Sequence, residues 1–147
     1  MKIIFYSYTG VHSAVIAAAI HLGTLPRYKS MERSQIAGLP LFAASQVLYQ
    51  LNYIGQDYRG NDLFTLGVGR ELKLIPKSII SFLRLYKIEG EIKLINTMLP
   101  LKRKARIGER LASLGMHDLG TRLFLHGILG DYERMCQYLD DKQLVDR

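Results

Sequence analysis

The first 23 residues constrain the fold more than any other stretch of the chain. Residues 2–8 are rich in β-branched and aromatic side chains with little alternation, which is typical of a strand buried on both faces. Thr9-Gly10 interrupts this run, and almost every position over 12–22 is small or aliphatic. The pattern predicts a buried strand that leads through a tight loop into the N-terminus of a buried helix.

This loop is predicted to bind a small phosphorylated or otherwise anionic ligand. The first turn of a helix has free N–H groups and the positive end of the helix dipole. Gly10 allows a ligand to approach closely, the hydroxyls of Thr9 and Ser13 can donate to phosphate oxygens, and His12 can add charge or transfer a proton. The alternative is that Thr9 or Ser13 only caps the helix and that His12 is hydrogen-bonded locally.

The rest of the chain is predicted to alternate between helices and strands. In the helix expected over 102–114, Ile107, Leu111 and Leu114 are predicted to face inward. Turn residues between two β-prone runs indicate a hairpin. The expected elements after the first helix are short helices near 31–38 and 42–48, hairpin strands over 48–56 and 63–68, a helix over 76–88, a strand over 92–97, the helix over 102–114, a short strand over 123–125, and a final helix capped by Asp131 and ending near Leu139.

This order predicts a single α/β domain over residues 1–147. We expect a three-layer, Rossmann-like sandwich with a mainly parallel sheet of about five strands that includes one β-hairpin. Ligands of such sheets bind at the carboxyl ends of the strands. The loops at 8–13, 96–98 and 126–130 are therefore expected to meet there.

The predicted site contains two histidines, because His126 follows a predicted strand and is expected to face the same pocket as His12. With Thr97 between them they are suited to phosphoester chemistry, although a strand-end histidine is more often satisfied by the backbone. The catalytic candidates are His12, Ser13 and His126, and the ligand-binding candidates are Ser7, Tyr8, Thr9, Gly10, Asn96, Thr97, Arg103, Arg106 and Gly127. The residue pattern predicts no metal site and does not identify a cofactor.

Several protein classes are disfavoured by the sequence. No Gly-Lys-Ser/Thr follows Gly10 at the Walker A spacing, which argues against ATP hydrolysis. The single cysteine, Cys136, cannot form an intrachain disulfide. No run of about 18 apolar residues and no signal peptide is recognised. We therefore expect a cytoplasmic protein that does not bind a membrane.

The chain is basic, with a formal net charge of +7. Between Leu101 and Arg122, six basic residues stand against Glu109 and Asp118, which gives +4 for that segment. An alternative function follows from this patch: a non-catalytic interaction protein whose basic helix face binds an acidic protein or nucleic acid. A basic helix face that is only solvated is the simpler interpretation.

Two resemblances add to this interpretation. With Ser7, Thr9 and Gly10, the run IIFYSYTGVHSAVIAAAI resembles the first strand and loop of flavodoxins, although His12 replaces the final threonine of their motif. This similarity implies FMN as a minority alternative, with its phosphate on the loop. Over more of its length the chain resembles a family of small uncharacterised proteins of spore-forming bacteria, about 150 residues long and classed only as a domain of unknown function. That resemblance implies one cytoplasmic α/β domain and no activity, and it is carried by Tyr8, Gly10, His12, Ser13, the AAAIHLG run, Leu25-Pro26, the 96–98 region and Gly127.

Overall fold

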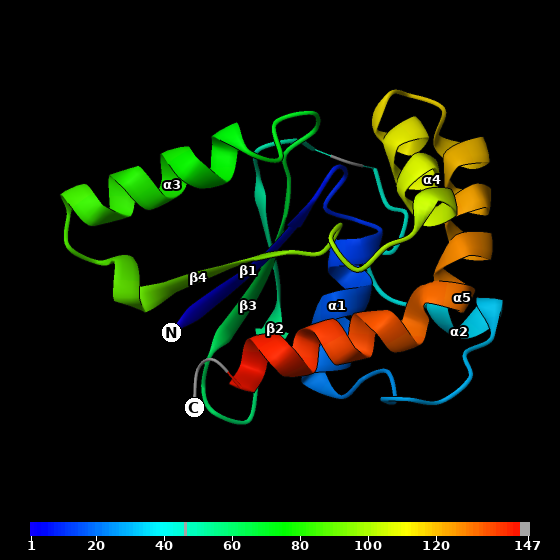
Figure 1. Cartoon of the computed structure of the whole chain (residues 1–147), viewed down its shortest axis with the longest axis horizontal. Coiled ribbons are helices and arrows are strands. Elements are labelled where there is room, and N and C mark those ends of the chain that lie inside the picture. The colour runs from blue at the N-terminus through cyan, green and yellow to red at the C-terminus, as the bar shows by residue number, and fades with distance from the viewer. Residues whose placement is uncertain (46, 145–147) are drawn as a thin grey trace.

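A four-stranded mixed sheet forms the centre of the molecule (Figure 1). The computed structural model describes residues 1–45 and 47–144. In the order β2-β3-β1-β4, β1 runs parallel to both of its neighbours, whereas β2 is antiparallel to β3. The strands are β1 (Lys2–Ser7), β2 (Leu51–Gln56), β3 (Asp62–Gly67) and β4 (Ile92–Asn96).

The predicted hairpin is confirmed as β2 and β3, but the prediction of a mainly parallel sheet of about five strands is wrong. The sheet is mixed because the hairpin adds an antiparallel strand at one edge. It has four strands in the described part of the chain because the run expected as a fifth strand is helical.

Helices cover both faces of the sheet, and the coverage is unequal (Figure 1). On one face, α1 (Ser13–Leu22) and α5 (His117–Leu144) form the larger core with side chains such as Phe5 and Ile16. On the other face, α3 (Leu74–Leu85) packs on a smaller core of β1 and β3 side chains. The remaining helical elements are α2 (Arg33–Ala37), the 3-10 turn η1 (Glu89–Glu91) and α4 (Arg103–Ser113).

The prediction of a helix near 42–48 is wrong for the described residues. Residues 42–45, 47 and 48 form turns and irregular backbone, and Gln46 lies outside the described residues. Ala43 adopts a left-handed backbone conformation and donates its N–H to the carbonyl of Val11. A tertiary hydrogen bond to the first loop thus replaces the local helical one.

The predicted strand over 123–125 is also wrong, because these residues lie within the long helix α5. Gly127, which was expected in the loop after this strand, instead allows close helix packing. A Cβ on Gly108 of α4 would come within 2.4 Å of the backbone nitrogen of Phe124, and Gly120 and Gly127 of α5 meet α4 backbone just as closely. Asp131, the expected cap, is an interior residue of this helix.

Close packing also changes which residues of α4 face inward. Ile107 and Leu114 were expected in the core, yet both are exposed. Side chains as large as isoleucine do not fit where two helix backbones nearly touch. The inward face consists of Ala105, Gly108, Glu109 and Ala112.

Within the described residues, the structure contains no helix that is both long and apolar enough to cross a membrane.

Candidate functional site

The loop between β1 and α1 is held tightly against the end of β3. Gly10 has a φ of +74°, and a Cβ there would lie 2.5 Å from the backbone nitrogen of Gly67. Only glycine combines this left-handed conformation with so close an approach. Its N–H donates to the Ser7 hydroxyl at 2.9 Å, so the loop satisfies this donor itself.

The carboxylate of Glu109, which comes from α4, occupies the N-terminus of α1. One carboxylate oxygen accepts the N–H of Ser13 at 2.9 Å, and the other accepts the N–H of Thr9 at 3.1 Å and its hydroxyl at 3.3 Å. Glu109 is fully buried. The donors expected to bind an external anion therefore bind an internal one, which also complements the helix dipole.

His12 continues this network on its far side. The ring Nδ1 of His12 is hydrogen-bonded to Thr9 Oγ1 at 2.7 Å, and Thr9 Oγ1 also lies 3.3 Å from the Glu109 carboxylate. The ring Nε2 of His12 is hydrogen-bonded to the hydroxyl of Thr121, on α5, at 2.8 Å. These bonds connect Glu109 through Thr9 and His12 to Thr121.

Burial keeps this imidazole neutral. The ring of His12 is enclosed by the rings of Phe42, Phe124 and His117 at centroid distances of 5.5, 5.3 and 6.0 Å. Burial lowers the pKa of His12 below its usual 6.5; the nearby Glu109 carboxylate opposes this shift, and His117 reinforces it. The sequence did not indicate a partner for His117.

The hydroxyls of Ser13 and Thr97 join the carboxyl ends of β1 and β4. Ser13 Oγ lies 2.9 Å from Thr97 Oγ1, which donates to the carbonyl of Tyr6 at 3.1 Å. Ser13 Oγ also contacts the sulfur of Met98 at 3.4 Å. The predicted meeting of the 8–13 and 96–98 loops is therefore observed, whereas residues 126–130 lie within α5.

The structure gathers one part of the predicted site and disperses the other. Asn96 accepts the N–H of Met98, and Tyr8 is half-buried beside the larger core. His126, Arg103 and Arg106 are exposed on α5 and α4, and Gly127 is packed against Ala105. The predicted residues that lie together are Ser7, Thr9, Gly10, His12, Ser13 and Thr97.

Glu109 and Thr121 were missed by the sequence interpretation. Glu109 is the single acid within the basic run 102–110, and its helical spacing places it on the face of Ala105 and Ala112. An acid in a stripe of small residues is a usable signal for a buried carboxylate. Thr121 carries no comparable signal.

A second carboxylate acts in the same way at the next helix. Asp131 of α5 is buried and accepts the N–H of Lys102, the residue before α4, at 2.9 Å. Thus α4 caps α1 and α5 caps α4, each with a side chain far away in sequence. This arrangement orients the helices relative to one another.

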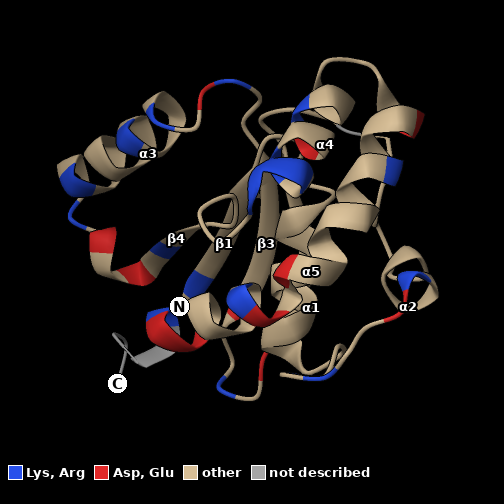
Figure 2. Cartoon of the chain, turned by 45° about the vertical axis from the view of Figure 1, so that its right-hand side comes forward, with Lys and Arg blue, Asp and Glu red and all other residues tan. Residues whose placement is uncertain are grey.

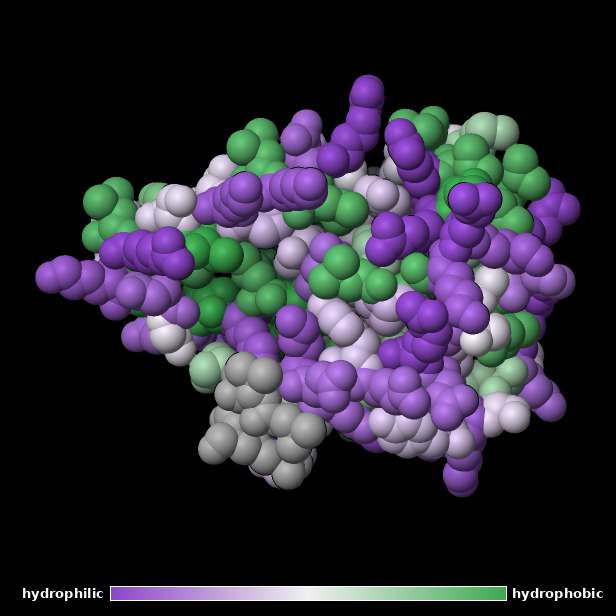
Figure 3. All heavy atoms as spheres, in the orientation of Figure 1, coloured by the Kyte–Doolittle hydropathy of each residue, from purple (hydrophilic) through white to green (hydrophobic). Residues whose placement is uncertain are grey.

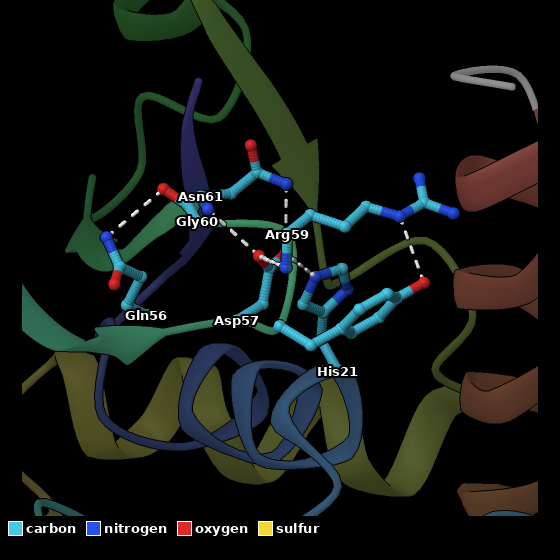
Figure 4. Close-up of polar contacts among 7 residues, drawn as sticks. His21, Gln56, Asp57, Arg59, Gly60 and Asn61 are labelled. Carbon is cyan, nitrogen blue, oxygen red and sulfur yellow. Dashed lines mark hydrogen bonds and ion pairs between the residues drawn. The ribbon is translucent and has the colours of Figure 1, made fainter.

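A separate pocket lies between the C-terminal end of α1 and the turn of the β2–β3 hairpin (Figure 4). We call it the hairpin pocket. Its volume is about 490 Å³, which is within the usual range for small-molecule sites. Its walls are Met1, Ile3, Ile20, His21, Leu22, Gly23, Arg27, Asp57, Tyr58, Arg59 and Asn61.

Asp57 organises the polar side of the hairpin pocket (Figure 4). One oxygen accepts the N–H groups of Arg59 and Asn61, and the other faces the Asn61 amide at 3.0 Å and His21 Nε2 at 2.9 Å. Burial of Asp57 raises its pKa, but hydrogen bonds from His21, Asn61 and Arg59 outweigh burial and bring the pKa to about 2. The carboxylate is therefore charged and fully used within the protein.

Two arginines border this pocket in different ways. Arg27 forms an ion pair with Asp140 of α5, which also accepts the hydroxyl of Tyr28. The guanidinium of Arg59 lies 5.3 Å from the ring centroid of Tyr58 and donates to its hydroxyl at 2.9 Å. Arg59 has no acidic partner among the described residues.

The chain belongs to the family described as "Protein of unknown function (DUF3189)", which matches residues 2–143. No curated protein and no solved structure matches the chain. The family confirms the resemblance noted in the sequence to an uncharacterised domain family. Among the residues that the structure describes, no group of three or more histidine, cysteine, aspartate or glutamate side chains is placed to hold a metal ion.

Proposed function

We propose that this protein binds a small anionic ligand and that the hairpin pocket holds it. The loop at Thr9–Ser13 is the less suitable seat, because its donors are already used by Glu109. The phosphate of FMN would need those same donors, so a flavin there would require Glu109 to leave. Phosphoester chemistry by His12 and Ser13 has the same requirement and stays a prediction.

The observation that carries the proposal is the exposed cation at the rim of a pocket with an apolar floor. Arg59 is free of acidic partners in the described part of the chain, and its guanidinium has donors to spare for an oxyanion. Met1 and Leu22, which also line the pocket and are at least partly exposed, offer an apolar surface to the rest of the ligand. Both oxygens of Asp57 accept hydrogen bonds from other groups, and its carboxylate forms no ion pair with the guanidinium of Arg59.

Native mass spectrometry of the purified protein, beside the denatured mass, shows whether a compound co-purifies. Titration with ribose 5-phosphate and adenosine 5′-monophosphate, followed by amide chemical shifts, then locates the site. We expect the largest shifts at His21 and over 57–61. Arg59→Ala removes a charged hydrogen bond of about 1.5–3 kcal/mol and weakens binding about 10- to 100-fold.

The matched control is Arg84→Ala, which removes an exposed arginine of α3 and leaves the affinity unchanged. Equal affinity of the Arg59 and Arg84 variants, or shifts centred on residues 9–13, would show that the ligand is not held by the hairpin pocket. Amide chemical-shift changes at residues 9–13 would assign the ligand site to the first loop.

A second candidate function rests on the surface of α4. All charged residues on the outside of α4 are basic, since Glu109 is buried (Figure 2). Arg103, Arg106 and Arg110 lie on one exposed stripe with helical spacing. This α4 basic face, which consists of Lys102, Arg103, Lys104, Arg106 and Arg110, is suited to an acidic protein or to nucleic acid phosphates.

Binding through the α4 basic face weakens steeply as salt rises. Fluorescence anisotropy with a labelled single-stranded oligonucleotide and with a polyglutamate peptide separates the two partner classes. The double variant Arg103→Glu with Arg106→Glu is expected to abolish binding. Arg33→Glu on α2 is the control, and a loss of equal size there would remove the α4 face as the cause.

A further inference from the structure

Helix α3 leaves an apolar stripe uncovered. Leu74, Ser78, Phe82 and Leu85 follow one another at spacings of four, four and three residues, so they share one side of the helix. Leu74, Phe82 and Leu85 are 59%, 57% and 76% exposed. We call these four residues the α3 stripe. Figure 3 shows hydrophobic residues at this end of the molecule, with hydrophilic residues between them.

The α3 stripe lies beside the side of α3 that contacts the sheet. Ile75 and Ile79, each one residue further along than a member of the stripe, pack against the smaller core, and Leu83, one residue after Phe82, is buried. Ile80 and Tyr86 are exposed as well. The apolar surface of α3 is therefore wider than the sheet beneath it covers.

The α3 stripe is suited to being covered by another protein surface. It contains no charged residue, and the hydroxyl of Ser78 already donates to the carbonyl of Leu74 at 2.8 Å. Burial of Ser78 in an interface therefore leaves no hydrogen-bond donor unpaired. The rings of Phe82 and Tyr86 pack on each other with centroids 4.8 Å apart, so this aromatic pair is ordered before a partner arrives.

The charges around α3 favour a second copy of the same chain. Lys73, Lys77 and Arg84 each precede a residue of the stripe, which places them about a quarter turn around the helix, away from the sheet. An apposed stripe does not bring them face to face. The segment 70–73 before α3 has a net charge of +1, and the segment 87–91 after it has −1.

We propose that the α3 stripe packs against the α3 stripe of a second copy, with the two helices antiparallel about a two-fold axis. This arrangement places the positive segment before one helix beside the negative segment after the other. It also opposes the two helix dipoles and puts the small Ser78 near the centre, where the backbones approach most closely. A two-fold contact is the commonest way for identical chains to associate.

The oligomeric state tests this proposal. Sedimentation equilibrium of the full chain, over protein concentrations from about 1 to 100 µM, is expected to show a monomer–dimer equilibrium. Phe82→Glu and Leu85→Glu each place a charge in the interface and are expected to raise the dimer dissociation constant by about 30-fold or more. Both positions are exposed, so circular dichroism and the melting temperature should stay close to those of the parent chain.

The control is Leu114→Glu, which changes an equally exposed leucine on the other side of the molecule and should leave the dimer intact. A monomer at every concentration, or a dimer insensitive to both α3 changes, overturns the proposal. A monomer that sediments with phosphatidylserine vesicles also overturns it and assigns the stripe to a membrane surface.

Cross-linking tests the orientation. In an antiparallel pair Leu74 of one copy lies near Leu85 of the other, so a mixture of Leu74→Cys and Leu85→Cys proteins should form a disulfide-linked heterodimer under mild oxidation. Neither variant should cross-link with itself. Cys136 is buried and does not compete. Self-linked Leu74→Cys protein would show a parallel pair and refute the antiparallel arrangement.

Discussion

Replacement of Glu109 by alanine tests whether an internal carboxylate supports the first loop. The change removes the acceptor for the N–H groups of Thr9 and Ser13 and for the hydroxyl of Thr9, all of them buried. Each buried donor left without a partner costs about 1–3 kcal/mol, although the loop can relax toward water in part. The loss of a negative charge at a helix N-terminus adds about 0.3–2 kcal/mol. We expect the free energy of unfolding to fall by about 3–5 kcal/mol, the range for breaking a buried charged contact.

Urea denaturation followed by circular dichroism measures this loss. Glu133→Ala on α5 is the matched control, because it removes an exposed glutamate and should change stability by less than about 0.5 kcal/mol. Glu109→Gln keeps the shape but substitutes a donor for one acceptor oxygen, so its cost should fall between the other two.

Chemical rescue tests whether the loss of stability comes from the missing carboxylate at the N-terminus of α1. Formate is small enough for the space left by the Glu109 side chain, so it should stabilise Glu109→Ala in a concentration-dependent way and leave the parent chain unaffected. Potassium chloride at the same ionic strength controls for screening. A Glu109→Ala protein as stable as Glu133→Ala, or one that ignores formate, would refute the assignment of Glu109 as an internal ligand of α1.

Three further predictions concern pH and packing. The pKa of Asp57 is about 2 in the folded protein and 3.8 in the reference state, so Asp57 contributes stability above about pH 4 that is lost as the pH falls toward 2. In an acid titration, the free energy of unfolding of Asp57→Asn should decrease less steeply than that of the parent chain. Burial lowers the pKa of His12 below 6.5, so as the pH falls the unfolded chain takes up a proton before the folded chain does. The free energy of unfolding should therefore decrease below pH 6.5, with a slope of up to about 1.4 kcal/mol per pH unit. Urea titrations of His12→Asn at pH 7.5 and 5.5 should lack this pH-dependent loss. Gly108→Ala would push a Cβ to within 2.4 Å of the Phe124 nitrogen and should lower the melting temperature by several degrees, as measured by calorimetry, whereas Gly90→Ala, with nothing near, should not.

Local patterns were sufficient for the elements whose signals are local. The buried strand and helix at the N-terminus, the 57–62 turn and the amphipathic segments of α3 and α4 follow from side-chain periodicity and from turn and cap residues within a few positions. The polar residues of the first loop were also recognised, because the strand–loop–helix order places them together at the carboxyl edge of the sheet.

Gly127 misled the sequence interpretation. It was placed in a loop after a short strand, yet it lies inside a helix of 28 residues. Its role depends on Ala105 of α4, against which it packs, and no local pattern shows that the two helix backbones meet. For the same reason His126 was expected at a strand end and instead lies exposed on a helix.

The sequence by itself determined the type of most elements, the mixture of α and β structure, and the polar character of the loop after β1. Only the tertiary structure decided what occupies that loop. Glu109 is about 100 positions away in sequence from the donors that it accepts, and it reaches them because α4 is held on α5 by close backbone contact. A helix N-terminus favours an anion, but the local sequence does not show whether a ligand or a distant side chain supplies it.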